Sequence, residues 1–519
     1  MITKNAIREN TYFDSIVLMS ISGQLRGING VEEVSIVMGS EANKEILNSI
    51  GLLTTEGEKA RPGDMIIAVR AESNEVVELV LKKAEELLSK RAMEVERREL
   101  KFPRSYEHAL RIMPDANFIL ISTPGQYAGR EAMAALQSGR SVMIFSDNVT
   151  VEEEIKIKKI AEEKGLLVMG PDCGTAIIGG VALGFGNALR RGPFGIVGAA
   201  GTGIQEVSSL LHRKGYGISH AIGTGSRDLS EAVGGISMLQ GIMALESDPL
   251  TDIIILISKP PAHMIAVKIL DIIKQLKKKY VINFLKGDPF EVEKRGIPFA
   301  GVLEEAAEIA IALYEKRAYT PAAFSEDEEV IKEKAKKEAR RIKKGSFLRG
   351  LFSGGTLADE AMIILNKEIG EIHSNIPLET RLKLKSSWES EGHTIVDLGD
   401  DEFTRGRPHP MIDFSIRCDR LLKEARDKNC GVILFDVVLG YGAHPDPAGE
   451  LIPVINKARE IASGDKRYID FVASITGTEE DPQKYSKQKK ALEEAGVVIL
   501  PSNAQAARFS ALVLKNTLL

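Results

Sequence analysis

Short apolar runs of strand length recur along the chain, and segments with helical spacing separate many of them. Helical spacing predicts helices over Ser15–Arg26, Glu41–Ile50, Asn74–Lys90 and Glu152–Lys164. The apolar runs predict strands over Val34–Met38, Met65–Val69, Asn117–Ile121, Ser141–Phe145, Leu166–Met169, Phe194–Gly198, Asp252–Ser258, Tyr280–Leu285, Phe347–Phe352, Val432–Val438 and Phe471–Ile475. We expect the run Asn117–Ile121 to be buried. Alternating strands and helices indicate parallel sheets with right-handed crossovers, so the predicted fold class is multi-domain α/β.

The pattern also predicts how the chain divides into domains. A length of 519 residues is too great for one core and predicts about three or four domains. The predicted parts are a small amino-terminal α/β module (1–97), a Rossmann-like domain (98–190), a first lobe (191–318), a charged helical linker (319–345) and a second lobe (346–519). The amino-terminal module carries no site motif, so we expect it to serve docking or dimerisation.

Composition narrows the functional classes. Hydrophobic residues make up 44% and charged residues 27% of the chain, which is usual for a globular protein with a large core. The net charge of −5, without a basic stripe interleaved with aromatic residues, argues against a nucleic-acid partner. Met1–Asn10 is not signal-like, and runs such as Ile253–Ile257 are too short to span a membrane. Three cysteines without a Cys-x-x-Cys motif favour a reducing cytoplasm.

The two lobes look like copies of one another. In the first lobe a strand leads to Gly201 and Thr202, with Glu206 four residues further on. In the second lobe a strand leads to Gly355 and Thr356, with Glu360 four residues further on. Later strands repeat at similar spacing, and the second copy carries a predicted insertion over about 373–419. A duplication is stronger evidence than either motif alone.

A glycine-rich turn joins strand to helix in each copy. Glycine allows a ligand to approach the backbone closely, and the amide groups that begin a helix bind anions. Tight packing also favours glycine, so each turn has an ordinary structural explanation. If the two turns face one another, they form a two-sided cradle for a phosphoryl group. The predicted phosphate-binding residues are Gly201, Thr202, Gly203, Gly354, Gly355 and Thr356.

These features resemble the NDP-forming acyl-CoA synthetases. Residues 100–313 are similar to the α subunit of succinyl-CoA synthetase, with a CoA-binding-type domain first, and residues 346–519 are similar to the ligase lobe of its β subunit. Gly170-Pro171-Asp172-Cys173 resembles that family's Gly-Pro-Asn-Cys turn, which implies that Asp172 contacts substrate. The resemblance also implies catalytic roles for Glu206 and Glu360, which match the acidic residues that steady the family's phosphorylated histidine.

The chain departs from that family at three places. The segment 286–301, where the family carries its histidine loop, contains no histidine. The glycine-rich CoA phosphate loop and the ATP-grasp segment have no counterpart in the sequence. These departures count against a bound CoA and against a histidine carrier, so no cofactor is predicted with certainty.

The whole chain resembles the FdrA family, a divergent branch of this superfamily. The motifs that carry the resemblance are Leu351-Phe-Ser-Gly-Gly-Thr-Leu357, Asp397-Leu-Gly-Asp-Asp-Glu-Phe-Thr404, Gly406-Arg-Pro-His-Pro-Met-Ile-Asp413 and Gly440-Tyr-Gly-Ala-His-Pro-Asp-Pro447. The resemblance implies oxamate carbamoyltransferase activity in allantoin and purine catabolism, with two other subunits. In that reaction oxalurate and phosphate give carbamoyl phosphate and oxamate. A cytoplasmic homo-oligomer acting with further subunits is therefore expected.

The second lobe supplies candidate residues for such chemistry. Arg405 and Arg407 could bind a carboxylate by paired hydrogen bonds, and His409, held between two prolines, could act as general acid or base. His444 and Asp446 follow a strand at its carboxyl end, where open α/β sheets place ligands. The arginines could equally be surface charges, and the histidines could cap turns.

The remaining candidates receive ordinary roles. The spacing of histidines and carboxylates matches no established zinc pattern, so no metal is predicted. We expect Cys173 to pack beneath the Asp172 turn rather than act as a nucleophile. Two alternatives to the transferase stay open: an ADP-forming acyl-CoA synthetase that uses a separate ATP-grasp subunit, and a non-catalytic subunit that keeps the fold.

Overall fold

The computed structural model describes residues 1–96, 103, 105–405 and 407–517. Met1–Asp115 forms an amino-terminal unit, and a larger unit comprises Ala116–Thr404 and Pro408–Leu519. The boundary predicted between residues 97 and 98 lies outside the described residues, as does Gly406. Among the described residues, no helix is long and apolar enough to cross a membrane.

The amino-terminal unit is a three-stranded antiparallel sheet covered by helices on both faces. Its elements are β1 (Ile2–Arg8), α1 (Ser15–Arg26), β2 (Val31–Met38), α2 (Glu41–Ser49), the short helix η1 (Gly57–Lys59), β3 (Met65–Ala71), α3 (Asn74–Glu96) and α4 (Tyr106–Ile112). The strand order is β1-β3-β2. The central strand is buried because α1 and α3 pack on one face and α2 packs on the other. The sequence reading missed β1, since this strand carries charged residues among its apolar ones.

The larger unit begins with a small parallel α/β layer. Its elements are β4 (Phe118–Ile121), α5 (Gly125–Gln137), β5 (Ser141–Ile144), α6 (Val151–Lys164) and β6 (Val168–Met169), and the strand order is β4-β5-β6. The expectation that Asn117–Ile121 is buried was wrong, because Leu120 is 44% exposed. The strand lies at the edge of its sheet and so lacks neighbours on one side.

The first lobe is built on a six-stranded sheet with the order β12-β11-β9-β10-β7-β8. Its elements are β7 (Thr175–Ile178), β8 (Val181–Gly184), β9 (Arg191–Gly198), α7 (Gly201–Arg213), β10 (Ile218–Gly223), α8 (Ile236–Ser247), β11 (Ile253–Ser258), α9 (His263–Ile273), β12 (Lys279–Phe284), α10 (Pro289–Glu293) and α11 (Leu303–Tyr314). Strands β9 to β12 are parallel, whereas the β7–β8 hairpin adds antiparallel strands at one edge.

The second lobe repeats this arrangement with the order β14-β15-β13-β16-β17-β18. Its elements are β13 (Phe347–Phe352), α13 (Gly355–Ile369), β14 (Ile372–Ser374), η2 (Thr380–Leu382), β15 (His393–Asp397), α14 (Asp401–Thr404), α15 (Ser415–Arg426), β16 (Cys430–Val438), α16 (Pro447–Gly464), β17 (Asp470–Thr476), α17 (Tyr485–Glu494), β18 (Val498–Leu500) and α18 (Asn503–Thr517). The predicted duplication is confirmed, because β10-β9-β11-β12 and β15-β13-β16-β17 have the same parallel order. The predicted insertion over 373–419 was too long, since this range contains β15, the counterpart of β10.

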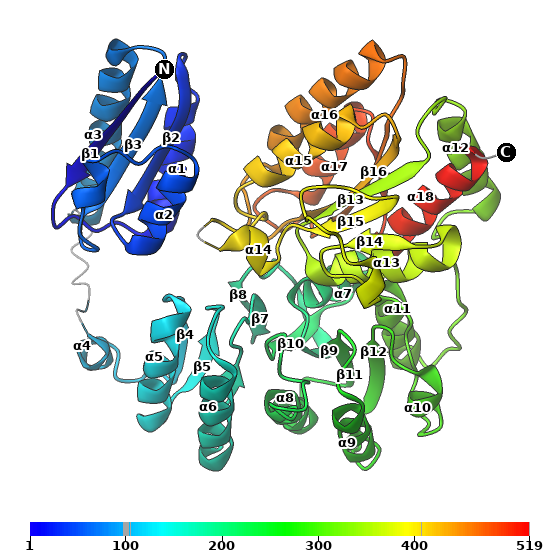
Figure 1. Cartoon of the computed structure of the whole chain (residues 1–519). Helices are drawn as coiled ribbons and strands as arrows, with labels where there is room; N and C mark the ends of the chain where they lie inside the picture. The colour runs from blue at the N-terminus through cyan, green and yellow to red at the C-terminus, as the bar shows by residue number, and fades with distance from the viewer. Residues whose placement is uncertain (97–102, 104, 406, 518–519) are drawn as a thin grey trace. The chain divides into compact units, whose positions relative to one another are not determined.

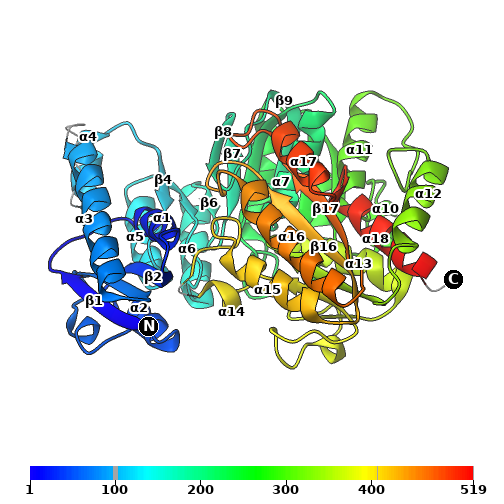
Figure 2. The same ribbon diagram turned by 90° about the horizontal axis from the view of Figure 1, so that it is seen from above.

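Four helices lie between the two sheets. Figure 1 shows α7 and α13 side by side where the lobes meet, and α11 and α18 continue the same layer. One apolar core, with members such as Val207, Ala307, Leu357 and Phe509, runs through all four helices. Helices α15, α16 and α17 cover the opposite face of the second sheet (Figure 2), while α8 and α9 cover the opposite face of the first. The lobes therefore share one core.

The predicted charged linker is part of this packing rather than a spacer. Helix α12 (Glu328–Ala339) buries Ile331, Ala335 and Ala339 in the shared core, against α18. Its charged residues occupy the other positions, which explains why the sequence predicted a charged helical linker.

Candidate functional site

The two glycine turns are in direct contact at the pseudo-dyad between the lobes. A β-carbon placed on Gly354 would lie 2.8 Å from Cγ2 and 2.9 Å from both Cβ and Oγ1 of Thr202. A β-carbon placed on Gly203 would lie 3.0 Å from Cγ2 of Thr356. In each turn a glycine, which lacks a β-carbon, thus leaves room for the threonine of the other turn. The helix starts meet as predicted, but the side chain of Thr202 fills the space beside Gly354, so no phosphoryl group fits between them at this point.

Adding a methyl group at this contact is expected to destabilise the protein. Gly354→Ala should lower the free energy of unfolding by about 1–3 kcal/mol, because overpacking a dense core costs this much. Thr202→Gly in the same chain should recover most of the loss, since it removes the atoms that the methyl group would meet. Denaturant unfolding of the single and double variants measures both effects.

Gly464→Ala is the matched control for this pair, because a β-carbon there meets no atom within 4 Å and the residue is helical. It should leave stability unchanged or raise it by up to about 1 kcal/mol. If Gly354→Ala behaves like this control, the two turns are not in contact.

A buried aspartate fastens the second turn to the sheet. Asp436, on β16, accepts the N–H groups of Ser353 at 2.9 Å and Gly354 at 2.8 Å, and it also accepts the Ser353 hydroxyl at 3.1 Å. Arg417 binds the same carboxylate at 2.6 Å, and both side chains are 1% exposed. The amides of Ser353 and Gly354 therefore already have a hydrogen-bond acceptor within the protein.

The glutamates at matching places in α7 and α13 cap helices of the opposite lobe. Glu206 Oε1 accepts the N–H of Asn503, the first residue of α18, at 3.1 Å, and Oε2 accepts the Thr476 hydroxyl at 2.5 Å. Glu360 Oε1 accepts the N–H of Leu303, the first residue of α11, at 2.6 Å, and Oε2 accepts the Asn503 side-chain amide at 2.7 Å. The exchange of caps joins the lobes. The predicted catalytic role of these glutamates stays a prediction, and the structure gives them this capping role.

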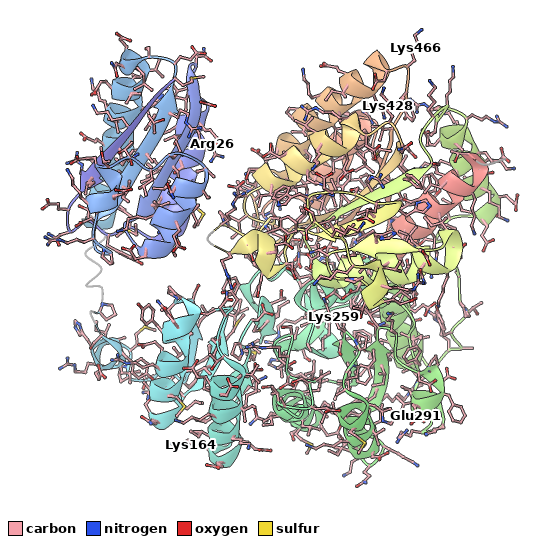
Figure 3. All side chains as sticks on the ribbon, viewed as in Figure 1. Arg26, Lys164, Lys259, Glu291, Lys428 and Lys466 are labelled. Carbon is pink, nitrogen blue, oxygen red and sulfur yellow. The ribbon has the colours of Figure 1, made fainter. Side chains whose placement is uncertain are left out.

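A charged cluster that the sequence reading missed lies at the start of α13. Lys259 follows β11 of the first lobe, and its ammonium pairs with Asp359 of α13 at 2.8 Å. A β-carbon on Gly355 would lie 3.5 Å from Lys259 Nζ and 2.6 Å from Oδ2 of Asp397, which ends β15. Figure 3 labels Lys259 where the lobes meet. The sequence could have indicated Lys259 as a candidate, because this residue directly follows a buried parallel strand.

The surroundings of this cluster raise the pKa values of two carboxyl groups, those of Asp397 and Asp172. Burial raises the pKa of Asp397 to about 7, although Lys259 and the N–H of Gly399 pull it down. Burial likewise raises the pKa of Asp172 to about 6, opposed by a hydrogen bond from the Ser226 hydroxyl at 2.6 Å. Burial alone would lower the pKa of Lys259, but Asp359 and Asp397 outweigh it and raise that pKa. Asp172 acts on Lys259 as well, which puts it in the same electrostatic neighbourhood.

His409 borders this cluster. A β-carbon on Gly399 would lie 2.8 Å from its Nε2, 2.7 Å from the Ser353 carbonyl and 3.1 Å from Oδ1 of Asp397. The ring packs on Phe185 with centroids 5.4 Å apart. Its Nδ1 accepts the N–H of Met411 at 3.2 Å, so in the neutral ring Nε2 carries the hydrogen. Burial lowers the pKa of His409 to about 4, which keeps the ring neutral at physiological pH.

The other predicted residues lie in local structure. His444 Nδ1 accepts the N–H of Asp446 at 3.2 Å, and Asp446 Oδ1 accepts the Gln488 amide at 2.9 Å. These bonds organise the turn before α16, as the alternative interpretation suggested. Arg405 and Arg407 are exposed. Catalysis by His444 and Asp446 and substrate binding by the two arginines stay predictions.

Cys173 is buried as expected. It is 2% exposed, and its thiol donates to the carbonyl of Gly223 at 3.4 Å. Burial raises its pKa to about 12, so the thiolate needed for nucleophilic attack is not formed at neutral pH.

Three family profiles match the chain. The CoA-ligase profile matches residues 351–513, and the profile of the CoA binding domain matches residues 190–287. The amino-terminal residues 1–101 match the profile described as "AllF, heavy metal-associated domain". The CoA binding match falls on the first lobe, whereas the sequence reading put the CoA-binding-type domain at 98–190.

Individual relatives agree with the profiles. The "Uncharacterized protein YahF" of Escherichia coli (strain K12) is 44% identical over 505 residues, 97% of each chain. Subunit alpha-2 of the mitochondrial ADP-forming succinate–CoA ligase of Trichomonas vaginalis is 31% identical over 93 residues, which is 17% of this chain and 30% of that one.

Solved structures show weaker likeness. The ATP citrate lyase of Methanothrix soehngenii, in complex with citrate and coenzyme A, has a TM-score of 0.35 and 12% identity, covering 80% of this chain and 85% of that chain. The apo dinucleotide-forming acetyl-coenzyme A synthetase 1 of Ca. Korarchaeum cryptofilum has a TM-score of 0.27 and 13% identity, covering 78% and 83%.

The duplicated lobes and the profile matches define a protein of the succinyl-CoA synthetase-like superfamily. Within this superfamily the chain belongs to the family that contains YahF. The superfamily inferred from the sequence motifs is thereby confirmed.

The amino-terminal residues do not fit a metal of the kind that the profile's description suggests. Residues 1–101 contain neither cysteine nor histidine, the thiolate and imidazole ligands that bind soft and transition metals. In the parts of the chain that the structure describes, no three His, Cys, Asp or Glu residues are grouped to hold a metal ion.

Proposed function

We propose that the chain is a subunit of oxamate carbamoyltransferase, which converts oxalurate and phosphate into carbamoyl phosphate and oxamate. The observation that supports this most is the start of α13, where Gly355 lies beside Lys259, because an acyl phosphate needs a held phosphoryl group. The segment 286–301 contains no histidine, and this favours transfer without a histidine carrier. The FdrA-like motifs and the amino-terminal AllF profile support the same assignment.

In the proposed reaction a phosphate oxygen attacks the ureido carbonyl carbon of oxalurate. The bond from that carbon to the inner nitrogen breaks, and oxamate leaves after its nitrogen gains a proton. The proton that hydrogen phosphate loses balances this gain, so the overall reaction neither consumes nor releases protons. The protein has to hold phosphate, polarise the carbonyl and relay one proton.

The test is phosphate-dependent cleavage of oxalurate by the full chain with its partner subunits. Thr356→Ala is expected to lower kcat/KM at least tenfold, because Thr356 lies in the first turn of α13, where we propose that the phosphoryl group binds. Arg407→Ala is expected to raise the KM for oxalurate through loss of a carboxylate contact.

Matched controls come from the same lobe. Thr380→Ala and Arg381→Ala alter an exposed threonine and an exposed arginine of η2, so both should keep wild-type kinetics. Unchanged activity in Thr356→Ala and Arg407→Ala would count against these site residues. No oxalurate cleavage by the wild-type assembly would reject the proposed function.

A ligase that uses a separate ATP-grasp subunit is the second candidate. The CoA-ligase and CoA binding profile matches favour it. It requires CoA binding and a histidine that becomes phosphorylated with ATP, and calorimetry with CoA together with phosphoamino-acid analysis tests both requirements. A chain that binds neither CoA nor phosphate would instead be the non-catalytic subunit.

A further inference from the structure

The sheet of the amino-terminal unit has two edges that are protected differently. The strand order β1-β3-β2 leaves β1 at one edge and β2 at the other (Figure 1). In an antiparallel pair, alternate residues direct their backbone N–H and C=O groups away from the neighbouring strand. An edge strand therefore presents a row of unpaired groups to which another strand can bind, unless the protein covers or distorts that row.

Helix α1 closes the edge formed by β2. The backbone N–H of Ile36, in β2, donates to the Ser22 hydroxyl of α1 at 2.9 Å, and both residues are buried. The register of β2 on β3 also shifts between Val31 and Glu33. A covering helix and an irregular register are two of the devices that keep edge strands from pairing. We therefore expect no further strand to add at β2.

The N–H of Ile36 also shows which backbone groups of β1 point outward. Ile36 lies opposite Ile67 of β3, and because its N–H turns away from β3, the backbone groups of Ile67 turn toward β1. Ile67 lies opposite Ala6 in the regular pairing of β1 with β3. The residues of β1 that alternate with Ala6, and so direct their N–H and C=O groups outward, are Thr3, Asn5 and Ile7.

Nothing recorded in the described part of the chain occupies the outward groups of β1. The backbone N–H and C=O groups of its three outward residues have no hydrogen-bond partner there. The two charged residues of β1 do not guard the edge, because they alternate with the outward residues and are neutralised by α3. Lys4 pairs with Glu78 of that helix. Arg8 pairs with Glu85, two turns further along.

We propose that β1 pairs with β1 of a second copy of this chain, in antiparallel orientation about a two-fold axis at Asn5. The two sheets would then form one continuous sheet. Thr3 of each copy would exchange its outward hydrogen bonds with Ile7 of the other copy, and Asn5 with its own counterpart. The surface of such an interface has to complement itself, because a two-fold axis uses the same patch on both copies.

The charges of β1 select this register. Centring the pair at Asn5 puts Lys4 opposite Ala6 of the second copy, and it puts Arg8 opposite Ile2. No like charges then lie directly opposite one another. A shift by two residues, which also brings outward groups together, would put Lys4 opposite either Lys4 or Arg8 of the second copy. Like charges directly opposite destabilise a pair of strands, so the register centred at Asn5 is favoured.

Helix α3 supplies opposite charges beside the same axis. It lies next to β1, as its ion pairs with that strand show. Lys82 is exposed and follows Glu78 by four residues, so both lie on the same side of α3. The α3 helices of the two copies would run antiparallel on either side of the axis. Lys82 of one copy can then approach Glu78 of the other, which adds attraction to the pairing of the strands.

The full chain tests the interface through an N–H group that only the dimer uses. Thr3→Pro removes the outward N–H without removing a bond between β1 and β3, and edge strands tolerate proline at such positions. Sedimentation velocity should show that the wild type forms an oligomer and that Thr3→Pro raises its dissociation constant at least tenfold. Thr3→Ala is the matched control. It also loses the hydroxyl that accepts from Arg70 at 3.4 Å, but it keeps the N–H and should assemble as the wild type does.

Disulfide cross-linking tests the register without depending on the fold of Thr3→Pro. A Lys4→Cys chain mixed with an Ala6→Cys chain should form a cross-linked pair on mild oxidation. In this register the two positions are a non-hydrogen-bonded pair with Cα atoms about 4.5 Å apart, within reach of a disulfide. Lys4→Cys mixed with Ile2→Cys is the control, because these positions would lie about 14 Å apart. Peptide mass spectrometry identifies the bond.

The proposal is overturned if the wild type is a monomer, if Thr3→Pro assembles as tightly as Thr3→Ala, or if Lys4→Cys does not cross-link to Ala6→Cys. A monomeric wild type that gains mass only with a different polypeptide would assign the β1 edge to a strand of that polypeptide and reject the second copy. Circular dichroism and the thermal midpoint check the fold of each variant. None of these outcomes depends on cleavage of oxalurate, so this inference is tested independently of the proposed function.

Discussion

Replacing Asp436 with alanine is expected to lower the free energy of unfolding by about 3–5 kcal/mol, because it leaves a buried charge without its partner. Asp436 is fully buried, and Arg417 binds both its carboxylate and its carbonyl. The same carboxylate also accepts the amides of Ser353 and Gly354. With alanine at this position, the guanidinium and both amides would stay buried but would lose the carboxylate that accepts their hydrogen bonds. Denaturant unfolding followed by circular dichroism measures the loss.

The controls separate this buried network from an ordinary ion pair. Asp271→Ala removes a carboxylate that is 57% exposed and pairs with Arg295 at 2.7 Å, so it should cost no more than about 1 kcal/mol. Asp436→Asn keeps the size and part of the hydrogen bonding, and we expect an intermediate loss. A loss below about 1 kcal/mol in Asp436→Ala would show that Arg417 does not depend on this carboxylate.

The fold could be predicted where local sequence decides local structure. The strand Phe347–Phe352 was predicted with the bounds that the structure gives β13, because a run of apolar residues stops at the glycine turn. The duplication was visible because the turn, the threonine and the glutamate keep their spacing in both lobes. Strand β15 was missed because Gly392 and several charged residues precede it, and only pairing with β13 makes it part of the sheet.

The candidate site could be predicted only in part. Sequence spacing placed Gly203 and Thr356 at helix starts, and the pseudo-symmetry of the copies predicted that the starts meet. Nothing in the local sequence indicated that Lys259 reaches Asp359 of the other lobe, since the partners lie 100 positions apart in the chain. Nor could spacing show that Glu360 caps a helix of the first lobe rather than facing a ligand.

The cap exchange between the lobes predicts a strong dependence of stability on pH. Burial raises the pKa of Glu360 to about 8, and the carboxyls of Glu206 and Glu304 add to the rise, while hydrogen bonds from Asn503 and Leu303 oppose it. The ordinary pKa of a glutamate is 4.5, so between that value and about 8 the folded protein keeps a proton that the unfolded chain has lost. Stability from this group is complete below about pH 4.5 and is lost as pH rises through about 8, at up to about 1.4 kcal/mol per pH unit.

Thermal and denaturant unfolding between about pH 5 and about pH 8.5 should therefore show a steeper loss of stability in the wild type than in Glu360→Gln, which has no proton to lose. Other buried carboxyls with raised pKa values, such as Asp397 and Asp470, add slope of the same sign to both proteins, so the difference between the two curves isolates Glu360. Ser510→Ala, at a buried position of α18 that does not titrate, should lower stability without changing the slope. Equal slopes in the wild type and Glu360→Gln would mean that water reaches this carboxyl. The interface at which Glu206 and Glu360 cap helices of the opposite lobe would then not exclude water.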